Sequence, residues 1–297
     1  MRTYKTNTVN HIMQETSFSP SIRSRFLVER EKVAVAKNLV PSHFHDYYEL
    51  YYLVSGERYY FIKDKTYHIK SGTLVLINPY DIHYTTKCED YGYERILVHV
   101  NKEYFKSFIN LVEDINLFEC FEKDIRIRKL NFQEQHFIES LFMTMINEYK
   151  SESAGSLSYM KTALVQLLIF INRHKGQETL KEEAYLNSAH KTISQITGFI
   201  NNNYSLNITL DEMSEKFYIS PYHLSRTFKK ITGFNFTDYI NGVRIKEAQK
   251  LLVKTNMHIA EIAEKVGYKS NTHFGRVFKK ITGMSPIVYR EMQHKKF

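Results

Sequence analysis

The sequence predicts an α+β protein with two domains, a β-barrel with flanking helices followed by an all-α domain. Three observations predict this organisation. Apolar residues alternate in short runs up to about residue 130 and then recur every three or four positions. A polar segment then separates these patterns from a basic C-terminal third that contains an internal repeat. The length of 297 residues also exceeds what one hydrophobic core usually organises.

Residues 1–130 contain short runs rich in Tyr, Val, Ile and Phe, and turn signals such as Ser71-Gly72 and Asn78-Pro79 separate them. This spacing predicts a small all-β domain, and we expect it to close into a barrel. A helix is expected after the last run, around Lys102 to Val112. The expected strands are YYELYYLV (Tyr47–Val54), RYYFIKD (Arg58–Asp64), TLVLI (Thr73–Ile77) and ERILVHV (Glu94–Val100).

Residues 131–175 predict two amphipathic helices on either side of the small polar stretch Ser151–Ser156. A stripe of this kind more often faces the core of its own domain than a partner subunit, although dimerisation through these helices is the alternative. The polar segment that follows has no apolar period and predicts an interdomain linker at 176–188. The expected apolar positions are Phe137, Leu141 and Met145 in the first helix and Leu164, Leu167, Leu168 and Ile171 in the second.

Residues 189–297 contain one helix-turn-helix unit twice. The segment Ser220–Ile240 aligns with Ser270–Arg290, and both share the pattern S-x-x-H-x-x-R-x-F-K-K-I-T-G. The serine is expected to cap the second helix of each unit, and the glycine to end it. A joining helix over Phe236–Thr255 has a length of about 30 Å, close to the roughly 34 Å between successive major-groove faces of B-DNA. The repeat therefore predicts two similar helices spaced for neighbouring grooves.

The second helix of each unit presents a polar face that suits DNA. Arginine forks onto guanine, asparagine onto adenine, serine and threonine bind either, and lysine holds phosphates. Packing alone does not require an arginine at the same position twice, which favours DNA binding over an ordinary helical hairpin. The expected contact residues are Tyr222, Ser225, Arg226 and Lys229 in the first unit and Asn271, Thr272, Arg276 and Lys279 in the second.

The net charge of +9 lies entirely in the last third of the chain. Residues 188–297 hold 17 Lys+Arg against 8 Asp+Glu, whereas residues 1–187 hold 24 of each kind. Such a surplus attracts the phosphates of DNA, although an acidic protein or an anionic membrane would be attracted too. Two cysteines, Cys88 and Cys120, are too few for a disulfide scaffold, and the longest apolar stretch, Ala163–Ile171, is too short to span a bilayer. We therefore expect a cytoplasmic protein without a membrane partner.

The run from about Thr192 to Arg290, including SPYHLSRTFKKITG and SNTHFGRVFKKITG, closely resembles the DNA-binding domain of AraC/XylS-family transcription regulators. The resemblance implies that the second helix of each unit enters the major groove. Gly275 stands where the family often has a longer side chain, which points to phosphate contacts for the second unit. The resemblance also implies a promoter-bound regulator, more commonly an activator, that works as a homodimer with RNA polymerase.

The N-terminal half carries a second pattern, because PSHFHDYYELYYLVSG places His43, His45 and Glu49 ahead of Gly56. This spacing resembles the first motif of cupin barrels, in which two histidines and a glutamate converge inside a small barrel. The second cupin motif contributes another histidine, and His83 of NPYDIHYT corresponds to it. The rest of that motif differs here, since Asp81 replaces the expected glycine.

Three interpretations of this cluster remain open. His43, His45, Glu49 and His83 form a donor set suited to Zn, Fe(II), Mn or Ni. Alternatively, the same residues with Tyr47 and Tyr51 line a metal-free pocket for a small effector, or the histidines are structural. The resemblance favours the metal-free interpretations, so we expect no cofactor. The many tyrosines suit a sugar or a related metabolite.

Two other functions compete with an effector-controlled regulator. One is a metal-dependent cupin enzyme with a basic DNA-binding appendage, and the other is an architectural DNA binder without an effector. We do not expect an enzyme.

Overall fold

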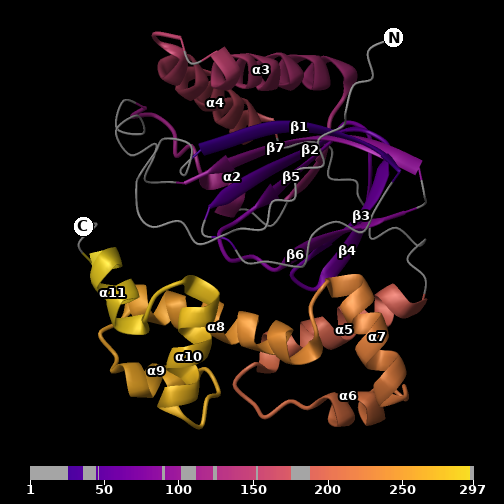
Figure 1. Ribbon diagram of the computed structural model, residues 1–297, viewed down its shortest axis with the longest axis vertical. Helices are drawn as coiled ribbons and strands as arrows, with labels where there is room; N and C mark the ends of the chain where they lie inside the picture. The colour runs from indigo at the N-terminus through magenta and orange to yellow at the C-terminus, as the bar shows by residue number, and fades with distance from the viewer. Residues whose placement is uncertain are drawn as a thin grey trace, which may run out of the picture.

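The computed structural model describes residues 26–35, 45, 47–88, 91–101, 112–122, 126–151, 153–174 and 188–294. The helix expected around Lys102 to Val112 and the linker expected at 176–188 lie almost entirely outside these residues, as does His43. Figure 1 shows a β-rich N-terminal domain, with two long helices over one face, stacked on a helical C-terminal domain. None of the described helices is both long enough and apolar enough to cross a membrane.

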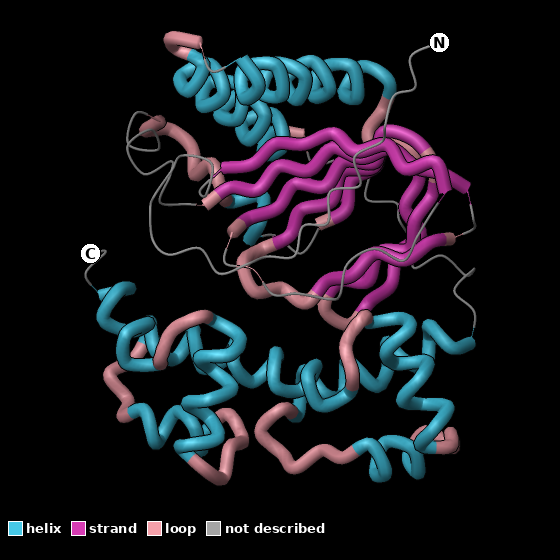
Figure 2. Tube along the Cα trace, viewed as in Figure 1, coloured by secondary structure: helices cyan, strands magenta, loops and turns pink. Residues whose placement is uncertain are grey.

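The described residues of the N-terminal domain form eight strands: β1 (Phe26–Val35), β2 (Tyr48–Ser55), β3 (Glu57–Ile62), β4 (Lys65–Lys70), β5 (Thr73–Ile77), β6 (His83–Lys87), β7 (Tyr91–Val100) and β8 (Ile127–Lys129). They build one antiparallel sheet in the order β1-β7-β2-β5-β8 and a smaller one in the order β4-β3-β6 (Figure 2). No strand pairing joins the two sheets within the described residues, so the prediction of a closed barrel is wrong. The reason is local. At Gly56 the backbone has a φ of 91°, and β3 leaves β2 to pair with β4 and β6 instead.

The two sheets enclose a layer of inward-facing side chains, which we call the interior. Alternation along the strands places every second side chain there. In the larger sheet β2 contributes Tyr51 and Leu53, and β7 contributes Tyr93 and Leu97. In the smaller sheet β3 contributes Tyr60 and Ile62. The interior is therefore apolar in its middle but also contains tyrosines and, as shown below, charged groups.

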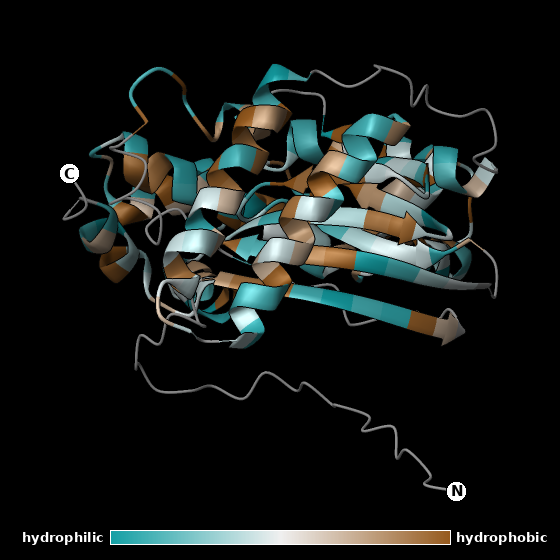
Figure 3. Cartoon of the chain, turned by 90° about the horizontal axis from the view of Figure 1, so that it is seen from above, coloured by the Kyte–Doolittle hydropathy of each residue, from teal (hydrophilic) through white to brown (hydrophobic). Residues whose placement is uncertain are grey.

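Two helices, α3 (Phe132–Ser151) and α4 (Ser156–Arg173), cover the outer face of the larger sheet. Hydrophobic and hydrophilic residues alternate along the helices in the view from above (Figure 3). The stripe expected on α4 is confirmed, because its four leucine and isoleucine positions are buried. On α3 the prediction that Phe137 faces the core is wrong. This residue is 40% exposed and packs on Phe170, while Ile138 and Phe142 join the core. The apolar face is thus rotated by one residue toward the sheet.

The C-terminal domain consists of seven helices: α5 (Ser188–Asn203), α6 (Leu210–Lys216), α7 (Pro221–Thr232), α8 (Phe236–Lys254), α9 (Ile259–Lys265), α10 (Asn271–Thr282) and α11 (Pro286–His294). Ser220 and Ser270 cap α7 and α10 as expected, each accepting a hydrogen bond from a backbone N–H. Gly233 and Gly283 end these helices with φ near 79° and 78°, the left-handed conformation that favours glycine. The repeated sequence thus folds into two similar helix-turn-helix units.

The central helix α8 belongs to the cores of both units. Tyr239 and Ile240 pack with α5 and α7, whereas Ile245, Ala248 and Leu252 pack with α9 and α10. The smaller sheet of the N-terminal domain rests on this frame. Its middle strand, β3, contributes Phe61 to the core of the first helix-turn-helix unit, and Ile82, just before β6, joins the same core. Tyr80 packs in the core of the second unit.

Candidate DNA interface and sensor pocket

The second helix of the first unit, α7, exposes the residues expected to contact DNA. Leu224 and Phe228 are fully buried on its inner face, which turns Tyr222, Ser225, Arg226 and Lys229 to the surface. Arg226 Nη1 donates a hydrogen bond to the Tyr222 hydroxyl at 3.1 Å, and the guanidinium lies 5.5 Å from the centre of the same ring. This contact orients the arginine before it meets a partner, which lowers the entropic cost of binding.

The equivalent helix of the second unit, α10, exposes Asn271, Thr272, Arg276 and Lys279, with Phe274 and Phe278 buried beneath them. Gly275 lies between them in open space, because a Cβ added there would meet no atom within 4 Å. The surface around Arg276 is therefore flatter than the one around Arg226. The outer faces of the two helices therefore differ in shape, and the expectation that the two units contact DNA unequally stays a prediction.

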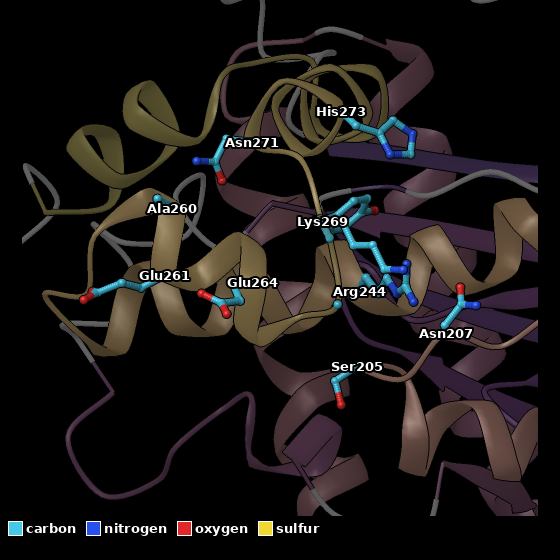
Figure 4. Close-up of a pocket in the computed structure, with 11 residues that line it drawn as sticks. Ser205, Asn207, Arg244, Ala260, Glu261, Glu264, Lys269, Asn271 and His273 are labelled. Carbon is cyan, nitrogen blue, oxygen red and sulfur yellow. The ribbon is translucent and has the colours of Figure 1, made fainter.

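A polar groove of about 770 Å³ separates the two units at the start of α10 (Figure 4). Arg244 of α8 forms part of its wall, where it donates hydrogen bonds to the backbone oxygens of Tyr204 and Leu206, both at 2.8 Å. Gly267 sits at the α9–α10 turn with a φ of 92°, and a Cβ there would lie 2.6 Å from the Ser205 oxygen. The loop before α6 thus packs directly on the second unit. The groove mixes Arg244 and Lys269 with two acidic residues, Glu261 and Glu264.

The N-terminal domain, called the sensor domain below, brings together His45, Glu49 and His83 of the expected cluster, whereas His43 lies outside the described residues. His45 Nε2 lies 3.3 Å from His83 Nε2 and 3.4 Å from Glu49 Oε2, and His83 Nε2 lies 3.8 Å from the same oxygen. The other ring nitrogens are fixed by the backbone, since His45 Nδ1 contacts the Tyr47 oxygen at 3.0 Å and His83 Nδ1 the Asp81 oxygen at 2.8 Å. Both Nε2 atoms therefore face the carboxylate.

A fourth group in this cluster, His99, was not recognised from the sequence. Its Nε2 lies 3.2 Å from Glu49 Oε2, because β2 and β7 pair with Glu49 directly opposite His99. The signal was present in ERILVHV, where strand alternation places this histidine on the inward face. Tyr47 stacks on both rings, 4.0 Å from His45 and 4.4 Å from His99 between ring centres.

The carboxylate at the centre of this cluster stays ionised. Burial by itself raises the pKa of Glu49, but the imidazoles of His45, His99 and His83 around the carboxylate hold it well below its ordinary value. Its other oxygen accepts a hydrogen bond from the Tyr60 hydroxyl at 3.1 Å. Tyr51, the remaining expected pocket residue, is buried and packs edge-on against Tyr60 with ring centres 5.1 Å apart.

The segment Asn78–His83 connects this cluster to the C-terminal domain. On the pocket side, the Tyr80 N–H donates to the His45 oxygen at 2.8 Å, and His83 supplies its imidazole. On the other side, the buried Asp81 carboxylate pairs with Arg126 of its own domain and with Lys246 of α8. Burial raises the pKa of Asp81, but Lys246, Arg126 and Lys63 hold it below its ordinary value. A carboxylate of the sensor domain is thus bonded to the central helix of the other domain.

Two family descriptions match this chain. One, an AraC-like ligand binding domain, matches residues 30–168, and the other, a helix-turn-helix domain, matches residues 213–292. The chain belongs to the AraC family of transcription regulators. It is a DNA-binding regulator with a helix-turn-helix domain at its C-terminal end and a ligand-binding domain at its N-terminal end.

Relatives that match most of the chain are distant. The uncharacterized regulator YfiF of Bacillus subtilis is 26% identical over 262 residues, 84% of this chain and 78% of that protein. The transcriptional activator RhaR of Mannheimia succiniciproducens is 24% identical over 283 residues, 93% of this chain and 98% of its own. A crystal structure of apo ToxT from Vibrio cholerae matches 90% of this chain and 97% of its own with 15% identity and a TM-score of 0.39, too low to compare sites.

A shorter match is closer. The bifunctional transcriptional activator and DNA repair enzyme AdaA of Bacillus subtilis is 40% identical over 100 residues, which are 34% of this chain and 47% of that protein. This match covers the helix-turn-helix region alone. It therefore does not support the alternative function, an enzyme with a DNA-binding appendage.

Proposed function

We propose that this AraC-family regulator binds promoter DNA through both helix-turn-helix units and activates transcription when a small molecule occupies its N-terminal domain. The observation that carries the proposal is the bonded path from the sensor pocket to the DNA-binding frame. His83 belongs to the cluster with His45 and Glu49, and Asp81, two residues earlier, pairs with Lys246 of α8. Activation is inferred from RhaR, which is named an activator. A homodimer that contacts RNA polymerase completes the proposal.

The proposed DNA contacts divide into two kinds. Arg226, with Tyr222 and Ser225 beside it, is proposed to contact base edges, because its guanidinium is exposed and already oriented. In the second unit Asn271, Thr272 and Arg276 surround the open Gly275, which leaves fewer atoms to reach into a groove. Lys229 and Lys279, in the last turn of each helix, are proposed to hold phosphates.

The test begins with selection of the DNA fragments that the full-length protein binds from the chromosome that encodes it. Fluorescence anisotropy on a selected promoter then compares the wild type with Arg226→Ala and with Lys265→Ala. Lys265 is exposed on α9, the helix before α10, and is not among the proposed DNA contacts. We expect Arg226→Ala to lose affinity for the selected site and discrimination at one base position, and Lys265→Ala to retain both. Equal behaviour of the two variants contradicts the proposed role of Arg226.

The proposed effector pocket consists of His45, Glu49 and His83 with Tyr47 and Tyr51, and a sugar or related metabolite is the proposed effector class. His45 and Glu49 are buried and fixed by hydrogen bonds, so a ligand would meet a rigid polar wall. Any change that a ligand makes at His83 acts on the same short segment as Asp81. Coupling of the two sites then follows, because each ligand biases the arrangement that the other meets.

One observation favours a second role for this cluster, the binding of a divalent transition-metal ion by His45, Glu49 and His83. Bonds of about 2.0–2.1 Å in a tetrahedral site place donor atoms roughly 3.3 Å apart, and the three donor atoms here are separated by 3.3, 3.4 and 3.8 Å. The contacts of both Nδ1 atoms with backbone oxygens orient the imidazoles as in metal sites. Such an ion would leave a position free for an oxygen atom of the effector.

A further inference from the structure

Arg58 is the most unusual charged residue of the sensor domain. Its side chain comes from β3, points into the interior and is 1% exposed. Its three nitrogen atoms have no hydrogen-bond partner, and no ion pair to it is found among the residues that the structure describes. The guanidinium carbon lies 4.4 Å from the centre of the Tyr93 ring. A buried charge without an anion is costly, so such a group requires an explanation.

Two hydroxyl groups beside Arg58 share this condition. The hydroxyls of Tyr51 on β2 and Tyr93 on β7 are buried and have no hydrogen-bond partner in the part of the chain that the structure describes. Burial raises the pKa of Tyr51, against the opposing charges of Arg95 and Arg58, and burial also raises the pKa of Tyr93. Both hydroxyls therefore remain protonated at physiological pH and are able to donate. Three strands thus direct a guanidinium and two hydroxyl donors into one part of the interior.

The charge balance of this region shows what kind of ligand is missing. Arg95, the other guanidinium near Tyr51, is neutralised by Glu31, with its Nε at 2.8 Å and its Nη2 at 2.7 Å from the carboxylate. No carboxylate plays this part for Arg58 within the described chain. The ionised carboxylate of Glu49 lies with the histidines and Tyr60, so Arg58 is left without a direct anionic partner. A neutral ligand would leave it uncompensated, whereas a carboxylate or phosphate matches the planar fork of the guanidinium.

We propose that Arg58, Tyr51 and Tyr93 bind the anionic group of the effector, and that the effector is a small organic acid or phosphate ester. This proposal rests on the proposed effector role of the N-terminal domain and narrows its ligand class. The guanidinium forms a two-pronged contact with two oxygen atoms, and the two hydroxyls donate to the remaining lone pairs. The surrounding rings and aliphatic side chains, from Tyr60 to Leu97, pack against the uncharged part of the ligand.

The first test measures the melting temperature of the full-length protein with acids and their neutral parents. The panel pairs gluconate and glucose 6-phosphate with glucose, benzoate with benzyl alcohol, and glycerol 3-phosphate with glycerol. We expect at least one anion to raise the melting temperature while its neutral parent does not, since only ligands that bind the native state stabilise it. The carboxylates and phosphate esters distinguish the two anionic groups. Absence of any shift specific to the anions overturns the proposal.

A matched pair of variants provides the second test without knowledge of the ligand. Arg58→Met removes an unpaired buried charge at similar side-chain length, so the ligand-free protein should melt about 2–4 °C higher than the wild type. Arg95→Met removes the partner of Glu31 and should melt lower. The anion-specific shift should disappear in Arg58→Met. A lower melting temperature of Arg58→Met, or persistence of the shift in it, contradicts the proposal.

DNA binding separates this proposal from the proposed function. In anisotropy titrations, the anion that shifts the melting temperature should change the promoter affinity of the wild type but not that of Arg58→Met, because the variant lacks the anion-binding guanidinium. Failure of the wild type itself to bind any chromosomal fragment would refute the proposed function instead. The anion site would then still be judged by its melting shifts alone.

Discussion

The ion pair between Asp81 and Lys246 gives the sharpest test of communication between the two domains. The Asp81 side chain is fully buried, and its carboxylate bonds to Arg126 of its own domain and to Lys246 of α8. Replacing Lys246 with methionine keeps the aliphatic stem and removes the charge that crosses the interface. Asp81 then retains one of its two cationic partners.

The structure sets the size of the expected effect. Breaking a buried ion pair by removing one partner costs about 3–5 kcal/mol. Arg126 remains in place, and the Lys246 side chain is 22% exposed, so we expect about 2 kcal/mol. That free energy belongs to contacts between the domains, and it changes the ratio of docked to undocked molecules roughly thirtyfold.

Lys250 provides the matched control one turn further along α8. It pairs with Glu247 of the same helix, and its side chain is 52% exposed, so its pair contributes no more than about 0.5 kcal/mol. Calorimetry of Lys246→Met should show a lower unfolding free energy with separated domain transitions, while Lys250→Met unfolds as the wild type does. In anisotropy titrations, Lys246→Met should still bind the promoter but no longer change its affinity with effector. Identical unfolding of the two variants would refute the reasoning.

The other predictions concern DNA contacts, helix ends and the metal. Arg226→Ala should lose about 1–3 kcal/mol of binding free energy for the specific site in a mobility-shift titration. An unchanged preference at every base position would exclude a contact between Arg226 and a base. At the end of α10, Gly283→Ala should lower the unfolding free energy by about 1 kcal/mol because its backbone is left-handed. Inside α10, Gly275→Ala should raise it by about as much, because the position is helical and open. Changes of the same sign in chemical denaturation would contradict this. Chelator-treated protein should gain cobalt(II) absorption bands with one equivalent of metal, and His83→Ala should not; unchanged bands in the variant would place the ion elsewhere.

The helical domain could be predicted almost completely from the sequence, because its signals are local. Ser220 and Ser270 cap their helices, glycine ends them, and phenylalanine four residues after Leu224 or Phe274 fixes the inner face. The exposure of Arg226 and Arg276 follows directly from that face. One amino acid change between the repeats has a non-local reason. Gly267 stands where the first unit has Tyr218, and both have a positive φ, but only at Gly267 does the Ser205 backbone approach too closely for a side chain.

The sensor domain was less predictable, because its arrangement depends on contacts far apart in the sequence. Strand alternation places His99 inward, but only the register of β2 with β7 sets it against Glu49. The closed barrel failed for a similar reason, since Gly56 redirects the chain from one sheet to the other without a change in strand pattern. Phe137 was misplaced because periodicity fixes the width of an apolar face better than its rotation. Arg58 gives no sequence signal at all, since most arginines in strands are exposed.

Strand β3 connects the proposed anion site to the DNA-binding domain by a second route. Arg58 and Tyr60 point into the interior, while Phe61, on the opposite face, packs in the core formed by α5, α7 and α8. Immediately after this strand, the Lys63 backbone oxygen accepts a hydrogen bond from the Tyr239 hydroxyl of α8. An anion bound at Arg58, as proposed above, would therefore contact a strand whose other face packs in the core of the first helix-turn-helix unit.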